Sequence, residues 1–501
     1  MSLAIVYSRA SAGINAPLVT VEAHLSNGLP SFQIVGLPEA AVKESRDRVR
    51  SALMNSHFEF PTKHITINLA PADLPKEGGR FDLPIAIGIL AASGQVPKDK
   101  LAEYELTGEL ALSGELRGVK GILPIVLAAK QANRKLIVPA ANADEAGLVN
   151  PDFVYAAKHL LDTCAYFRDA QALPLCTFEQ KTPAKTYLDM QDVKGQQHAR
   201  RALEIAAAGQ HSILFIGPPG TGKTMLASRL LGLLPDLSED LALEVAAVAS
   251  LSITGFTCQS WRKRPFRAPH HSASNIALVG GGRPPRPGEI SLAHRGILFL
   301  DELPEFNRAV LDSLREPLES HCVTISRASY QTLFPANFQF VAAMNPCPCG
   351  YVGSQHKSCR CSPDQITRYR HRISGPLLDR IDLQIEVPHL PASQLNDHAQ
   401  QVESSQSIRA RVAAAQTVQL ARQGQLNAQL QNAALIEHCA LTDKTTTLLN
   451  QMINRYNLSA RSNNRLLKIA RTIADLDHSP TIEPNHLAEV MGYRHFDKIK
   501  S

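Results

Sequence analysis

Residues 217–224, with the sequence GPPGTGKT, restrict what this chain can fold into more than any other segment. They fit the phosphate-binding pattern GxxxxGK[ST] at every position. An apolar run at 213–216 precedes them, and a helix-compatible stretch at 225–231 follows. The pattern predicts a buried strand, a glycine-rich loop and a helix whose N-terminus faces a phosphate group. A turn that only resembles the motif is the alternative, and the flanking strand and helix argue against it.

Two side chains at the end of this segment, called the phosphate loop below, have predicted roles. Lys223 is expected to neutralise the β- and γ-phosphates, and the Thr224 hydroxyl is expected to ligate Mg²⁺. The chain is therefore expected to bind and hydrolyse a nucleoside triphosphate, with ATP and Mg²⁺ as cofactors. The predicted nucleotide-binding residues are Gly217, Pro218, Pro219, Gly220, Thr221, Gly222, Lys223 and Thr224.

The composition is that of a globular chain with several domains. Its 501 residues predict roughly three domains, and a hydrophobic content of 44% suffices to bury their cores. It has no apolar run of membrane-spanning length, and the N-terminus lacks the layout of a secretory signal. We therefore expect a cytoplasmic protein without a membrane partner, whose nine cysteines are reduced or metal-bound. The net charge of +6 permits contact with a polyanion but does not predict one.

Periodicity divides the chain into two α/β units and a helical region. The expected boundaries are 1–170 for the first unit, 171–187 for a linker, 188–390 for the unit with the phosphate loop, and 391–501 for the helical region. Expected strands are 18–25, 64–69 and 135–139, expected helices are 39–55, 82–93, 443–456 and 463–476, and residues 394–431 have a helical composition.

Two further apolar runs end in polar residues suited to nucleotide chemistry. The run at 297–300 leads into Asp301 and Glu302, and the run at 338–344 leads into Asn345. In parallel sheets the carboxyl ends of strands share one edge. We expect Asp301 to hold Mg²⁺, Glu302 to polarise the attacking water and Asn345 to orient it. The alternatives are a solvated acidic pair and a turn asparagine before proline.

The stretch between Lys223 and Asp301 is longer than a strand–helix–strand unit needs, so an insert is expected at 252–290. Its first part interleaves basic residues with Trp261 and Phe266, which is the pattern of single-strand binding. Its second part, 280–288, is rich in glycine and proline and is expected to project as a loop. A structural insert with solvated cations is an equally weighted alternative. The predicted DNA contacts are Arg264, Arg267, His270 and His271, with Arg327 near the tip of a hairpin whose first arm is 322–329.

Four of the nine cysteines lie close together, in the stretch 346–362 that we call the four-cysteine loop. They are Cys347, Cys349, Cys359 and Cys361. Two close thiol pairs can supply a tetrahedral site, and Zn²⁺ suits that geometry in a reducing compartment. The alternative is four unligated thiols. The expected role is to make the loop behind Asn345 rigid.

Together these motifs resemble the AAA+ ATPases. Residues 377–382, LLDRID, resemble the segment that carries the arginine finger in the Mg-chelatase and MCM branches. The resemblance implies that Arg380 reaches the γ-phosphate held by a neighbouring subunit. Residues 459–465 resemble the sensor-2 region at the start of a lid-domain helix, with Arg461 the first choice and Arg465 the second.

The first unit resembles the proteolytic domain of Lon over residues 69–80 and 106–114. That family works through a serine–lysine dyad. The serine position falls on Arg80 and the lysine position on Leu123, and no serine lies between 74 and 92. The resemblance therefore implies a Lon-like, ribosomal S5-like α+β domain without peptidase activity, used for oligomer contacts or substrate handling.

From end to end the chain is similar to the ComM-type, or YifB-like, proteins, which are Mg-chelatase-like. The segments that carry this resemblance are 36–45, 265–271, 345–350, 374–382 and 470–477. It implies an AAA+ core with a parallel sheet, a C-terminal helical lid domain and a homohexamer. It also implies an ATP-driven helicase that acts on single-stranded and branched DNA. Such a helicase promotes branch migration in natural transformation and homologous recombination, beside the recombinase machinery.

Two other functions remain as alternatives. One is a motor subunit of magnesium chelatase, although the chain has no DxSxS metal-adhesion motif and its first unit argues against it. The other is an ATP-dependent protease, against which Arg80 and Leu123 argue.

Overall fold

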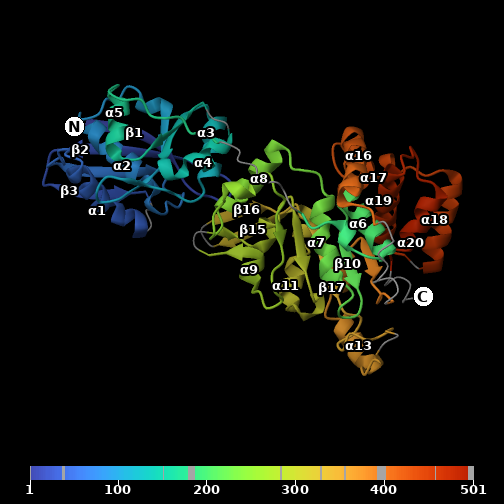
Figure 1. Ribbon diagram of the computed structural model, residues 1–501. Coiled ribbons are helices and arrows are strands. Elements are labelled where there is room, and N and C mark those ends of the chain that lie inside the picture. Colours follow the sequence, from blue (N-terminus) through green and yellow to red (C-terminus); the bar gives the residue numbers. More distant parts are fainter. Residues whose placement is uncertain are drawn as a thin grey trace.

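The computed structural model describes residues 2–36, 40–149, 152–178, 187–282, 285–327, 330–354, 357–391, 402–456 and 458–494. An N-terminal unit, a central unit and a C-terminal helical region follow one another along the molecule (Figure 1). Residues 179–186 of the expected linker lie outside the described residues. None of the described helices combines the length and the apolarity that crossing a bilayer requires.

The N-terminal unit is built on a seven-stranded sheet with the order β3-β4-β2-β1-β5-β8-β9. Buried and part-exposed residues alternate along β2, as on a sheet with one covered face. Helix α2 is buried over its whole length and packs on β1 and β2. The strands are β1 Ser2–Arg9, β2 Leu18–Ser26, β3 Ser31–Val35, β4 His64–Ala70, β5 Tyr104–Leu106, β6 Glu109–Leu110, β7 Leu116–Arg117, β8 Lys135–Pro139 and β9 Val154–Ala157. The helices are α1 Ala40–Asn55, α2 Asp82–Ala92, α3 Ile122–Gln131, α4 Ala143–Ala146 and α5 Leu160–Phe167.

The central unit holds a five-stranded parallel sheet with the order β11-β14-β17-β10-β18. Strands β10, β14 and β17 are buried at every position, which is why β10 and β14 consist of apolar residues alone and β17 is apolar after Gln339. The sheet strands are β10 Ile213–Ile216, β11 Phe266–Arg267, β14 Ile297–Leu300, β17 Gln339–Met344 and β18 Leu383–Glu386. The helices are α6 Gln197–Gly209, α7 Lys223–Leu233, α8 Glu239–Ser250, α9 Asn275–Val279, α10 Glu289–Leu292, α11 Arg308–Ser313, α12 Pro317–Ser320, α13 Pro363–Arg370 and α14 Gly375–Leu378.

The expected insert at 252–290 is not one projecting element, because β11 lies inside it and pairs with β14 at the edge of the sheet. The glycine-rich part forms the short hairpin of β12 Gly280–Gly281 and β13 Arg286–Pro287. A longer hairpin follows later, formed by β15 Cys322–Arg327 and β16 Tyr330–Pro335.

The C-terminal region consists of helices that pack on the central unit. Helix α19 contacts α6 and α16, and one apolar cluster joins residues of these helices to the central sheet. The helices are α16 Ser405–Gln423, α17 Asn432–His438, α18 Asp443–Tyr456, α19 Ala460–Leu476 and α20 Pro484–Met491. The helical composition predicted at 394–431 therefore corresponds to α16, while residues 392–401 lie outside the described part.

Several contacts join the N-terminal unit to the central unit. Helix α3 packs against α8, with Ala246 and Ala247 inside the apolar cluster around α3. The turn after β1 contacts the long hairpin, because a Cβ atom on Gly13 would lie 2.7 Å from Cγ2 of Thr332. Gly13 has a φ of +62°, so glycine suits this close approach.

Candidate active site

The phosphate loop connects β10 to α7, as the sequence predicts. Gly220 and Gly222 have φ values of +79° and +87°, which a residue with a side chain adopts only with strain. Nζ of Lys223 donates hydrogen bonds to the carbonyl oxygens of Gly217 and Pro218 at 2.7 and 2.8 Å. Burial lowers the pKa of Lys223 from its ordinary value, and the nearby Asp301 and Glu302 oppose that shift.

The residues predicted to hold magnesium lie side by side. Oγ1 of Thr224 donates to Oδ2 of Asp301 at 2.6 Å. Hydroxyl and carboxylate oxygens are the donors that Mg²⁺ prefers, so this pair fits the ion. Glu302 follows with a φ of +52°, and its N–H donates to Oδ1 of Asp301 at 2.9 Å. Left-handed backbone at a residue other than glycine stores strain of the kind found at functional sites.

Asn345 completes the cluster at the edge of the sheet. Its Oδ1 accepts a hydrogen bond from Nζ of Lys223 at 3.2 Å. The predicted residues therefore come together as expected, around a cavity of about 430 Å³. The cavity is lined by residues 219–225 together with Asp301, Glu302, Met344 and Asn345.

The sulfur atoms of the four-cysteine loop also lie close together. Sγ of Cys347 is 3.4 Å from that of Cys349 and 3.7 Å from that of Cys359, and the Cys349–Cys359 separation is 3.5 Å. With Cys361, all four sulfurs lie within 4.8 Å of one another. A tetrahedral zinc site with Zn–S bonds of about 2.3 Å requires sulfur separations of about 3.8 Å. The arrangement is therefore compatible with Zn²⁺.

The four-cysteine loop packs against the phosphate loop. Gly350 has a φ of +84°, and a Cβ atom there would lie 2.6 Å from Cδ of Pro219. The sulfur cluster and the nucleotide cavity are thus structurally connected through one glycine–proline contact.

Arg380 and Arg461 lie together, and neither is among the residues lining the phosphate-loop cavity of the described chain. Nη2 of Arg380 is 2.7 Å from Oε1 of Glu319, and Nη2 of Arg461 is 3.4 Å from the same oxygen. Nη1 of Arg380 donates to the carbonyl of Pro376 at 2.7 Å. The two arginines line a second cavity of about 470 Å³, called the arginine cavity below.

Arg465, the second choice for the sensor-2 role, is buried, and its ion pair is with a carboxylate of the same chain. Its Nε lies 3.6 Å from Oδ1 of Asp382. Asp382 also accepts the backbone N–H of Ser212 at 3.1 Å and contacts His211 at 3.4 Å. Burial by itself would raise the pKa of Asp382, but its contacts with His211 and Arg465 hold that pKa below its ordinary value. These contacts favour Arg461 over Arg465 as a residue that meets nucleotide.

Two of the predicted DNA contacts are engaged within the chain. Arg264 is partly buried and donates to the carbonyls of Pro235 and Arg295 at 2.8 and 2.7 Å, and burial lowers its pKa to about 10. Arg267 forms a two-point ion pair with Glu289, with both distances 2.6 Å. Both arginines therefore stabilise the central unit in this conformation, in line with the structural alternative.

The histidines after β11 point toward the catalytic edge of the sheet. The rings of His270 and His271 lie 4.0 Å apart, and Nδ1 of His271 is 3.3 Å from Oε2 of Glu302. This contact between the expected DNA segment and the expected catalytic carboxylate was not predicted. Arg327 ends β15 as expected, but its side chain lies outside the described residues.

Trp261 is not a free stacking platform, contrary to the sequence interpretation. Its ring lies 6.3 Å from that of Phe178, edge to face, and it packs against the apolar cluster around α3. The aromatic residue of the insert thus joins the central unit to the N-terminal unit.

Exposed cations gather instead on the four-cysteine loop and α13, which projects from the central unit (Figure 1). Lys357 lies over the ring of Tyr351 at 5.1 Å. Within the described chain, the side chains in this group have no carboxylate partner. They are Lys357, Arg360, Arg368 and His371. Sequence reasoning missed this surface, although the run 357–372 is visibly basic.

The residues at the Lon-like dyad positions cannot perform that chemistry. Leu123 is buried in α3, and Nη2 of Arg80 donates to the carbonyl of Lys120 at 3.4 Å. Burial lowers the pKa of Arg80 from its ordinary value.

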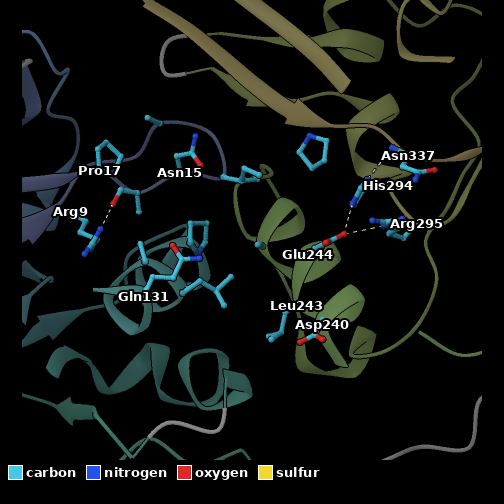
Figure 2. Close-up of a pocket in the computed structure, with 18 of the residues that line it drawn as sticks. Arg9, Asn15, Pro17, Gln131, Asp240, Leu243, Glu244, His294, Arg295 and Asn337 are labelled. Carbon is cyan, nitrogen blue, oxygen red and sulfur yellow. Dashed lines mark hydrogen bonds and ion pairs between the residues drawn. The ribbon is translucent and has the colours of Figure 1, made fainter. Parts of the chain in front are cut away.

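A larger cavity, of about 920 Å³, lies between the N-terminal and central units. Figure 2 shows Arg9, Asn15 and Gln131 on one side and Glu244 with His294 on the other. Oε2 of Glu244 lies 3.1 Å from Nε2 of His294 and 3.0 Å from Nε of Arg295, so this carboxylate contacts two basic side chains.

Comparison with known proteins gives matches along the whole chain. Family models described as "Magnesium chelatase, subunit ChlI", "Subunit ChlI of Mg-chelatase" and "Magnesium chelatase, subunit ChlI C-terminal" match residues 189–395, 21–142 and 402–494. The chain is 56% identical to "Competence protein ComM" of Haemophilus influenzae, over 99% of this chain and 98% of that protein. It is 52% identical to the uncharacterized protein YifB of Escherichia coli, over 100% of this chain and 98% of that protein. A shorter match, 27% identical over 31% of this chain and 32% of the relative, is to "Lon protease 2" of Bacillus subtilis.

Proposed function

Because the chain belongs to the ComM/YifB family of magnesium-chelatase-like AAA+ proteins, we propose that it is an ATP-driven DNA motor. It assembles as a homohexamer and promotes branch migration of single-stranded and branched DNA during natural transformation and homologous recombination. The observation that carries the ATPase part is the convergence of Lys223, Thr224, Asp301, Glu302 and Asn345 on one cavity. The relative named as a competence protein supports the DNA part.

Hydrolysis follows from the roles of these side chains. Lys223 and the N–H groups of the phosphate loop bind the phosphate chain of ATP. Thr224 and Asp301 hold Mg²⁺, which when bound supplies charge neutralisation at the β- and γ-oxygens. Glu302 polarises the attacking water, and Asn345 orients it.

Arg380 acts on the nucleotide of a neighbouring subunit. Its position outside the lining of its own phosphate-loop cavity supports this role in trans, and Arg461 lies beside it on Glu319. A guanidinium at the γ-phosphate stabilises charge that grows in the transition state, an effect worth about 10³-fold or more in rate. Each active site is therefore completed by two chains.

Zn²⁺ is the metal that we assign to the four-cysteine loop. The close sulfur separations support it. The contact of Gly350 with Pro219 supports a role in fixing the phosphate loop, beside the loop that carries Asn345.

DNA is gripped by the β15–β16 hairpin and by the exposed cations of the four-cysteine loop and α13. Phosphate contacts need cations without intrachain anions, and Lys357, Arg360 and Arg368 meet that condition within the described residues. Arg267 does not in this conformation, because it pairs with Glu289, and Arg264 uses its donors on backbone carbonyl groups.

ATPase rates measured with and without single-stranded or forked DNA test the proposal. We expect DNA to raise the rate, and we expect strand displacement by the wild type but not by Lys223→Ala or Glu302→Gln. An unchanged rate with no detectable DNA binding would contradict the motor. ATP-dependent insertion of Mg²⁺ into a porphyrin, in the presence of the other chelatase subunits, would instead favour the chelatase alternative.

A further inference from the structure

Glu319 is the point at which the two transition-state arginines meet. It lies on α12, whereas Arg380 follows α14 and Arg461 lies at the start of α19. One oxygen, Oε1 of Glu319, is 2.7 Å from Arg380 and 3.4 Å from Arg461. Segments distant in the sequence thus place both guanidinium groups on a single carboxylate.

The arginine cavity is lined by more cations than carboxylates. Its walls include Arg380, Arg461, Arg465 and Lys468. Asp382 is the other lining carboxylate, and its contacts with His211, Ser212 and Arg465 already engage it.

Arg380 retains an unused donor in this arrangement. Its side chain is only 11% exposed, and its buried Nε has no hydrogen-bond partner among the described residues. A buried guanidinium donor without a partner favours the arrival of a further anion. The cavity therefore fits a multivalent oxyanion better than it fits Glu319 alone.

We infer that Glu319 is an internal substitute for the γ-phosphate of ATP held by a second copy of this chain. It keeps Arg380 and Arg461 paired, and the phosphate of the neighbour displaces it when the subunits assemble. The inference rests on the proposed function, because it requires the arginines to act in trans. Glu319 is 51% exposed, and an ion pair this exposed is weak enough to be exchanged.

Glu319 lies close in the sequence to the long hairpin, so its release can move the hairpin. Glu319 is three positions before Cys322, the first residue of β15. Oγ of Ser320, between them, donates to the carbonyl of Cys322 at 3.1 Å. Release of Glu319 therefore acts at the base of the element that we assign to DNA, so that nucleotide in one subunit is sensed by the hairpin of the next.

Nucleotide-dependent assembly of the full chain tests this inference. The Glu302→Gln background prevents turnover, and mass photometry or sedimentation velocity follows assembly as ATP and Mg²⁺ are added. Glu319→Gln removes the competing anion, so we expect half-maximal assembly at about two- to fivefold less ATP. Glu316→Gln is the matched control, since its exposed side chain makes no ion pair with the described residues and lies one helical turn earlier. Glu319→Asp keeps the charge and is expected to behave like the parent.

The inference would be overturned by equal assembly of the Glu319→Gln and Glu316→Gln proteins, by weaker assembly of Glu319→Gln, or by a shift that persists when Arg380 and Arg461 are both alanine. A parent that binds ATP but never self-associates would overturn it as well. Loss of the proposed ATPase is a separate outcome, recognised by the absence of hydrolysis in the wild type. Thermal unfolding and ATP binding of each variant show that it is folded.

Discussion

Nδ1 of His271 lies 3.3 Å from Oε2 of Glu302, which ties the segment after β11 to the carboxylate that we propose polarises water. Both side chains are partly exposed, at 36% and 52%. A carboxylate held by a histidine is less free to orient a water molecule. The contact therefore links the conformation of this segment to the readiness of the catalytic edge.

Replacing His271 should release Glu302. We expect His271→Ala to raise the ATPase rate without DNA by about two- to fivefold, since a partly exposed polar contact is worth up to about 1 kcal/mol. The ratio of the rates with and without DNA should fall. Steady-state assays at saturating ATP measure both. His270→Ala is the control, because its ring contacts His271 and Ser272 and not Glu302 within the described residues. An equal effect of both variants would contradict the link.

Mixing two inactive variants tests the role of Arg380 in trans. Arg380→Ala lacks the finger but keeps its phosphate loop, and Lys223→Ala has the reverse defect. In a symmetric ring mixed at equal amounts, about a quarter of the interfaces combine an intact loop with an intact finger. We expect ATPase to recover toward that fraction. The absence of any recovery in rings shown to contain both chains would count against the shared site.

Loss of the metal from the four-cysteine loop should lower the activity of the nucleotide site. We expect the purified wild type to hold one Zn²⁺ per chain and Cys347→Ser with Cys359→Ser to hold none, as measured by mass spectrometry of metals. Because Gly350 rests on Pro219, the variant should also lose kcat by about tenfold or more. Cys439→Ser, which changes a buried thiol directly after α17 and outside the cluster, is the control. Wild type without zinc would refute the assignment.

Charge reversal on α13 and the four-cysteine loop should weaken DNA binding without reducing ATPase in the absence of DNA. Removing two phosphate contacts with Arg360→Glu and Arg368→Glu is expected to lower the slope of log K against log salt by about 1.4 for single strands. Fluorescence anisotropy at several salt concentrations provides the slope. Arg455→Glu, at an exposed arginine of the C-terminal region, is the matched control. Equal slopes for all three proteins would place the DNA elsewhere.

The stability of the N-terminal unit should fall as pH rises, because of Glu145. Burial raises the pKa of Glu145 to about 7, well above its ordinary value of 4.5. The folded state therefore favours the neutral acid, and the stability that this proton supplies is lost as pH rises from about 4.5 to 7. Glu145→Gln should stabilise the protein by about 2 kcal/mol at pH 8 and have little effect at pH 4.5.

Urea unfolding followed at both pH values measures this difference. Asp144→Asn, at the exposed neighbour on α4, controls for the removal of a negative charge. A gain for Glu145→Gln that is the same at both pH values would show that burial of the charge is not its cause.

The catalytic edge was predictable because its signals are local. The phosphate loop is a contiguous motif, and Asp301, Glu302 and Asn345 each follow a fully buried strand, so parallel pairing alone brings them to one edge. The sulfur cluster was predictable for the same reason, since its four residues are close in the sequence.

The sequence did not predict which side chains of the insert are exposed and which make contacts within the chain. Composition does not tell whether an arginine meets solvent or a partner, and Arg267 meets Glu289 while Trp261 meets Phe178 of another unit. The meeting of Arg380 and Arg461 on Glu319 likewise depends on the packing of three separate segments. No periodicity or spacing encodes such contacts.

The close contact of Gly13 with Thr332 means that the N-terminal unit supports the long hairpin from one side. Thr332 lies midway along β16, where it pairs with Ile325 of β15. A movement of the hairpin at its free end is therefore transmitted to the residues that it contacts near its middle. If the hairpin tilts against the central sheet, the loop at 10–17 must slide or travel with it. In the proposed motor, the N-terminal unit would therefore move with each tilt of the hairpin.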